Sequence, residues 1–158
     1  MKFRTVFAGS VLSAISFVVA AQTMKPTLNL DTARRAAVGC EEKAQREGWS
    51  MTIAVTDLAG NIKYFSRADA AIGISVGLAQ AKAATSASLP LSTRKLREVA
   101  ANQAKGLELT PGISLVAGGL PLVMRGQHLG GIGVSGGTED QDELCAQAGL
   151  DAVAALLK

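Results

Sequence analysis

Four stretches of the chain place small or apolar residues three and four positions apart, which is the spacing of one face of an α-helix. Asn29 or Asp31 is a suitable N-cap for the first stretch, which runs to about Glu47 and ends at Gly48. The other predicted helices are Gly73–Leu89, a helix from Ser92 or Thr93 to Gly106, and Glu139–Leu157.

Between these helices lie five apolar or alternating stretches that are bounded by turn residues, a pattern typical of β-strands. The predicted strands are Met51–Thr56, Ile62–Arg67, Ile113–Ala117, Pro121–Arg125 and Leu129–Ser135. Short links such as 57–61 and 126–127 favour antiparallel pairing. The order α-β-β-α-α-β-β-β-α predicts an α/β (α+β) sandwich, in which helices flank a five-stranded, mainly antiparallel sheet.

The first 21 residues are typical of a secretory signal peptide. Lys2 and Arg4 precede the mostly apolar stretch 6–20, and the small residues 19–21 suit cleavage before Gln22. The apolar stretch is too short for a stable membrane span, although a retained N-terminal anchor stays an alternative. We therefore expect a signal peptide (1–21), a flexible lead (22–28) and one domain (29–158), in the periplasm or secreted, with no membrane contact after cleavage.

The charge balance argues against nucleic acid as a partner. Of the 16 basic residues, Lys2 and Arg4 lie in the leader, so 14 remain against 13 acidic residues and the mature net charge is +1. No stripe of Lys and Arg interleaves with aromatic residues. No metal site is predicted, because no second His, Cys or carboxylate lies at zinc-site spacing from His128.

Both cysteines remain after cleavage, and an even number in an exported chain favours pairing. Cys40 lies on a face of small residues in the first helix, and Cys145 lies on a similar face in the last helix. Two such faces can approach closely enough for a disulfide. We expect a Cys40–Cys145 bond, with two buried free thiols as the alternative.

The stretch 130–137 contains five glycines and leads into Thr138, with Gln141 completing a capping box. Its G-x-G-x-x-G spelling lacks the second strand of a dinucleotide-binding unit, so NAD or FAD binding is not expected. Its G-x-S-x-G spelling around Ser135 is not followed by a histidine, which disfavours a nucleophile elbow. The helix start could receive an anion through backbone N–H groups, but the acidic residues 139–143 favour a structural cap.

Several motifs in this order resemble the GlcG/HbpS family, which includes the haem-binding C-terminal domain of PduO-type proteins. They are Val55-Thr56-Asp57-x-x-Gly60, Arg67-x-Asp69, Ala79-x-Ala81-Lys82-Ala83-Ala84-Thr85, Pro111-Gly112, Gly118-Gly119-x-Pro121, and Gly130-x-Ile132-Gly133-Val134-Ser135-Gly136-Gly137-x-x-x-x-Asp142. The resemblance covers nearly all of 30–158. It implies a profilin-like sandwich, homo-oligomers that are often octamers, and haem as the ligand.

The resemblance also directs attention to possible haem ligands. PduO-type domains look to use a histidine on the first helix, where this chain has Arg34 and Arg35. The single histidine of the chain, His128, is therefore the candidate axial ligand. The alternative is that His128 is an exposed turn residue without a ligand role. Tyr64 and the methionines of the mature chain are further residues able to bind haem iron.

Seven residues are candidates for contact with a small-molecule ligand: Arg67, Asp69, Lys82, Ser135, Gly136, Gly137 and Asp142. Arg67 suits a carboxylate such as a haem propionate, or it pairs with Asp69 or Asp142. Lys82 lies among alanines, so it is an anion contact, a tuned base or a lysine whose amine reaches solvent. Asp142 could instead receive Lys82 or Arg67 from a neighbour.

Three functions remain open on these observations. The first is an exported, oligomeric protein that binds a small ligand, with haem as the cofactor. The second is an enzyme that acts on a small carboxylate or oxidised metabolite, with Arg67 and Lys82 as the catalytic pair. The third is an accessory or scaffold subunit without a site of its own.

Overall fold

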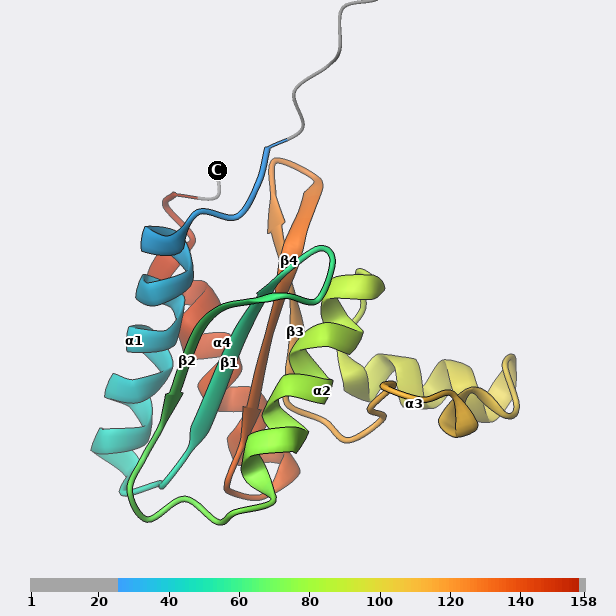
Figure 1. Ribbon diagram of the computed structural model, residues 1–158, viewed down its shortest axis with the longest axis horizontal. Helices are drawn as coiled ribbons and strands as arrows, with labels where there is room; N and C mark the ends of the chain where they lie inside the picture. The colour runs from blue at the N-terminus through green and yellow to red at the C-terminus, as the bar shows by residue number, and fades with distance from the viewer. Residues whose placement is uncertain (1–25, 157–158) are drawn as a thin grey trace, which may run out of the picture.

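The computed structural model describes residues 26–156, so the predicted signal peptide and residues 22–25 of the lead lie outside the described part. One antiparallel sheet has the strand order β2-β1-β4-β3. Its elements follow in this order: α1 (Leu30–Glu47), β1 (Thr52–Asp57), β2 (Ile62–Arg67), α2 (Ser75–Ser88), α3 (Thr93–Asn102), the 3₁₀ turn η1 (Leu107–Leu109), β3 (Gly119–Met124), β4 (Gln127–Ser135) and α4 (Glu139–Val153). Helices α1 and α4 cover one face of the sheet and α2 covers the other (Figure 1).

The helix ends follow the local sequence. The Asn29 side chain accepts a hydrogen bond from the Thr32 N–H and so caps α1, and Gly48 ends this helix with a left-handed φ of 72°. The predicted capping box of α4 is present, with Thr138 and Gln141 exchanging side-chain-to-backbone bonds. Among the described residues, no helix is long and apolar enough to cross a bilayer.

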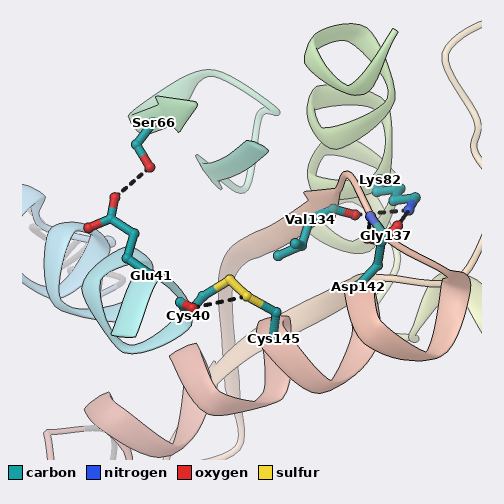
Figure 2. The surroundings of a disulfide bond; sticks show 8 residues. All are labelled: Cys40, Glu41, Ser66, Lys82, Val134, Gly137, Asp142 and Cys145. Carbon is teal, nitrogen blue, oxygen red and sulfur yellow. Dashed lines mark hydrogen bonds and ion pairs between the residues drawn. A yellow bond between two sulfur atoms is a disulfide. The ribbon is translucent and has the colours of Figure 1, made fainter. Parts of the chain in front are cut away.

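Small residues and a disulfide hold α1 against α4. A Cβ atom on Gly39 would lie within 3.0 Å of the Ala152 Cβ, so the two helix backbones are close. The Cys40–Cys145 disulfide joins the helices with a Cα–Cα distance of 4.6 Å (Figure 2). This confirms the predicted bond, which lies within the larger of the two hydrophobic clusters.

On the opposite face, α2 lies on a stretch of β4 that has almost no side chains. A Cβ atom on Gly133 would lie within 3.0 Å of the Ala79 carbonyl oxygen and the Ala83 nitrogen, and one on Gly131 would meet the Ala83 carbonyl oxygen equally closely. The glycines therefore let the backbone of α2 approach the backbone of β4. The glycine-rich segment serves the packing of this helix.

The fifth predicted strand, Ile113–Ala117, is absent from the described part of the chain, so the sheet has four strands there and the predicted element order needs correction. The segment is irregular because side chains satisfy its backbone. The Ser114 N–H donates to the Thr85 hydroxyl, and the Ala117 N–H donates to the Glu139 carboxylate. Its apolar β-branched composition does not distinguish this arrangement from a strand.

Helix α3 projects away from the sheet and is tied to α4 by ion pairs (Figure 1). Arg94 contacts Asp140 and Glu143, and Arg97 contacts Glu139. Exposed pairs of this kind each contribute about 0–1 kcal/mol. The start of α3 is also held by buried Leu96 and by the Gly119 N–H, which donates to the buried Thr93 hydroxyl.

The disulfide is expected to contribute strongly to stability. Replacing both cysteines, Cys40→Ala and Cys145→Ala, should lower the free energy of unfolding by about 4–5 kcal/mol, because the bond closes a loop of 105 residues in the unfolded chain. Urea unfolding followed by circular dichroism measures this change. Dithiothreitol should destabilise the unaltered protein and leave the double variant unchanged; equal stability of the two proteins would contradict the expectation.

The close approach of α2 to β4 predicts that a side chain added between them lowers stability. Gly133→Ala should destabilise the protein by about 3 kcal/mol, because the new methyl group meets backbone atoms of α2. Gly77→Ala, in α2 on the other side of this contact, is the control: nothing outside its own helix turn lies within 4 Å of the added methyl, and alanine favours the helix by up to about 1 kcal/mol. Similar unfolding midpoints for the two variants would show that the approach is looser than described.

Candidate functional site

Lys82 and Asp142 form a buried ion pair where α2, β4 and α4 meet (Figure 2). The Lys82 ammonium lies 2.6 Å from the Asp142 Oδ2 and donates a second hydrogen bond to the Val134 carbonyl oxygen at 2.8 Å. The other carboxylate oxygen, Oδ1, accepts from the Gly137 N–H at 3.0 Å. The side chain of Lys82 is 0% exposed and that of Asp142 is 4% exposed.

Burial raises the pKa of the Asp142 carboxyl, while the Lys82 ammonium and the Gly137 N–H oppose that rise. The paired charges compensate each other inside the protein, where an isolated charge would be very costly. The geometry gives Lys82 a structural partner and gives no solvent path to its amine. The lysine whose amine reaches solvent, one of the sequence-based interpretations, is therefore wrong for this residue.

The start of α4 has little capacity left for an anion. The Gly137 N–H donates to Asp142, and the Thr138 N–H donates to Gln141. Gly136 adopts a φ of 148° and a Cβ there would meet the Ser50 carbonyl oxygen, so it is placed by packing. Ser135 is buried in the last position of β4. Residues 135–138 thus form a structural cap for α4, which is the role that the acidic residues at the start of this helix favour.

Arg67 and Asp69 lie apart from the buried ion pair, at and just after the end of β2. The Arg67 guanidinium donates to the Ala71 carbonyl oxygen at 2.5 Å, and Asp69 is exposed. Among the described residues no ion pair joins Arg67 to Asp69 or Asp142, so neither of the predicted pairs forms. Arg67 instead lies at the edge of a cavity between α1 and β2.

His128 is half-buried, and its Nε2 lies 2.9 Å from the Ser86 carbonyl oxygen. A carbonyl oxygen only accepts, so Nε2 carries the proton and the Nδ1 lone pair of the neutral ring is available to a metal. A backbone carbonyl that orients a histidine in this way is typical of metal-binding histidines. The idle, exposed turn histidine considered from the sequence does not match this position.

Tyr64 is the second residue able to bind haem iron. It is half-buried on β2, and the Arg34 guanidinium of α1 lies 6.0 Å from the centre of its ring. Met51 is buried and Met124 is half-buried against the larger hydrophobic cluster. Met24 lies outside the described residues.

Sequence reasoning missed two features of this face. Glu41 accepts a hydrogen bond from the Ser66 hydroxyl at 2.5 Å, which joins α1 to β2 (Figure 2). The cavity beside this bond is lined by Trp49 and Met51. The single tryptophan of the chain was the one available signal, since large aromatic side chains frequently line ligand cavities.

Comparison with known proteins identifies the family. Residues 28–151 match the family model described as "Haem degrading protein HbpS-like". The chain belongs to the HbpS-like family. A 15.0 kDa protein encoded between dhaT and dhaS in Citrobacter freundii is 34% identical over 79% of this chain and 91% of its own length. Protein GlcG of Escherichia coli K12 is 35% identical over 60% of this chain and 71% of its own length.

Solved structures agree with this assignment. The HbpS double mutant from Streptomyces reticuli is 32% identical, with a TM-score of 0.80 over 91% of this chain and 99% of that chain. A PduOC–haem complex is 27% identical, with a TM-score of 0.76 over 80% of this chain and 95% of that chain. Residues 26–156 of this HbpS-like chain thus have an α+β fold of four α-helices and a four-stranded antiparallel sheet, as predicted in outline.

The ion pair can be tested by a double-mutant cycle. Lys82→Met and Asp142→Asn should each lower the free energy of unfolding by about 3–5 kcal/mol, because each leaves a buried charge without its partner. The double variant should lose clearly less than the sum of the two losses. Urea unfolding of the four proteins gives the coupling energy, and additive losses would contradict the structural role.

Proposed function

We propose that this HbpS-like protein is an exported, oligomeric haem-binding protein. The observation that carries the proposal is its similarity to the PduOC–haem complex over most of both chains, together with the match to the HbpS-like family model. Family similarity alone is a weak warrant for function, so the donor groups of this chain need to suit haem as well.

The donor groups suit haem. Histidine and tyrosine are both axial ligands of haem iron in proteins. We propose His128 as the axial ligand through Nδ1, because the hydrogen bond to Ser86 leaves that atom without the proton. Tyr64 is the alternative ligand, and the nearby Arg34 offers a cation for a propionate. Haem supplies an iron centre with open coordination chemistry, and these residues hold and orient it.

The size of the cavities supports binding at the surface of the protein. Five cavities in the described part of the chain have volumes of about 250 to 380 Å³. A cavity of about 150 Å³ holds one benzene molecule, and haem is several times larger than benzene. A single chain therefore covers haem only in part, which is one reason to propose that a second copy encloses the remainder.

Two features support export. The leader resembles a signal peptide, and a disulfide persists in oxidising compartments such as the periplasm or the extracellular space. The enzyme hypothesis has less support, because Lys82 is buried in an ion pair and lines none of the cavities described above. The accessory-subunit hypothesis predicts no ligand, and the haem titration addresses it directly.

Titration of the purified apo protein with haemin should give a saturable shift of the Soret band. His128→Ala should weaken haem affinity by at least tenfold and change the spin state seen in the absorption and EPR spectra, because the axial ligand is lost. Gln127→Ala, at the neighbouring exposed position, is the matched control and should bind haem as the unaltered protein does.

The results separate the function from the ligand assignment. A haemin spectrum identical to that in buffer would refute haem binding altogether. Unchanged affinity and spectra in His128→Ala, with losses in Tyr64→Phe, would keep haem binding and move the axial ligand to Tyr64. Analytical ultracentrifugation of the apo and haem-loaded proteins tests self-association, and a monomer in both states would contradict the oligomer.

A further inference from the structure

A cavity of about 250 Å³ lies between the C-terminal half of α1, the start of β1 and the end of β2. Its apolar lining includes Ala44, Trp49, Met51 and Ile53. Met51 and Ile53 are buried members of the larger hydrophobic cluster, and Trp49 packs against that cluster. The lining is thus continuous with the core and offers rigid apolar walls.

The volume limits the occupant. Since about 150 Å³ holds benzene, a cavity of 250 Å³ holds about ten non-hydrogen atoms. That is the size of one six-membered ring with one small substituent. The cavity is not lined by His128, the axial ligand proposed above, so its occupancy can be tested separately from haem binding.

The polar groups at the cavity differ in their availability. The Glu41 carboxylate accepts a hydrogen bond from the Ser66 hydroxyl at 2.5 Å (Figure 2). The Lys43 ammonium lies close to the Trp49 ring, but Lys43 does not line the cavity and is paired with Glu47. Arg67 lines the cavity, is exposed, and uses one Nη2 donor on the Ala71 carbonyl oxygen.

A guanidinium has five N–H donors, so the bond to Ala71 leaves Arg67 able to pair with an anion. The bond also fixes one side of the guanidinium, which reduces the entropy lost when a ligand carboxylate pairs with it. The cavity therefore combines apolar walls with one oriented cation.

We propose that this cavity binds a small ring-containing carboxylate, with the ring against Trp49, Met51 and Ile53 and the carboxylate on Arg67. This activity goes beyond haem binding and does not depend on it. The preference for an anion over a cation follows from exposure: Arg67 is exposed and keeps free donors, whereas Glu41 is half-buried and one of its two carboxylate oxygens accepts from Ser66.

The probe is 4-fluorobenzoate, followed by fluorine NMR, with 4-fluorobenzylamine as the cationic counterpart of the same shape. 4-Fluorobenzoate should bind saturably with a dissociation constant of about 0.1–1 mM, a normal affinity for a ligand of this size. It should also change the fluorescence of Trp49, which is the single tryptophan of the chain. 4-Fluorobenzylamine should bind at least tenfold more weakly.

Three variants test the geometry. Arg67→Gln should weaken 4-fluorobenzoate binding by about tenfold, because it removes a charge-assisted hydrogen bond. Lys63→Gln removes an equal charge from an exposed position of the same strand, outside this cavity, and should bind as the unaltered protein does. Ala44→Leu fills the cavity and should abolish binding.

Circular dichroism establishes that each variant is folded. If Ala44→Leu does not fold, the comparison of Arg67→Gln with Lys63→Gln decides the matter, because both residues are exposed. The proposal is overturned if 4-fluorobenzoate does not bind saturably at 10 mM or below, a limit about tenfold above the expected range. It is also overturned if the amine binds equally well, or if Arg67→Gln and Lys63→Gln have the same affinity.

Discussion

The contact between the backbone of α2 and the glycines of β4 is the constraint on which the rest of the structure depends. At Gly131 and Gly133 even a methyl group would meet main-chain atoms of α2. This short separation between helix and strand lets the Lys82 side chain reach both the Val134 carbonyl oxygen and the Asp142 carboxylate of α4. One lysine thereby links a helix from each face of the sheet through the end of the strand between them.

The two faces of the sheet are stabilised in different ways. The face under α1 and α4 has the larger hydrophobic cluster, built from aliphatic residues of the sheet and alanines of the helices, and a disulfide, whereas the face under α2 has close backbone packing and the ion pair. Aromatic residues make up only 4% of the chain, so aromatic side chains contribute little of the buried apolar area. The disulfide compensates for this limited aromatic burial by constraining the unfolded chain, whereas the ion pair first has to offset the cost of burying its own two charges.

Much of this was predictable from local chemistry. The capping box at Thr138, the antiparallel hairpin at 57–61 and the Cys40–Cys145 bond follow from residue types at fixed spacing. Ile113–Ala117 was predicted wrongly because its backbone bonds go to side chains distant in sequence, Thr85 and Glu139. The partners of Lys82 and His128 are likewise set by tertiary contacts, since each bonds a backbone carbonyl that no sequence pattern identifies. The roles of the candidate ligand residues stay predictions.

Native-state hydrogen exchange tests the central constraint most directly. If the α2–β4 contact holds the fold together, the amides of Ala83 in α2 and Ile132 in β4 should exchange only through global unfolding, with the same free energy of opening as urea unfolding gives. Amides of α3, which projects from the sheet and buries few of its residues, should exchange through smaller local openings. Exchange of α2 at a free energy well below that of β4 would show that the helix detaches separately and would contradict this account.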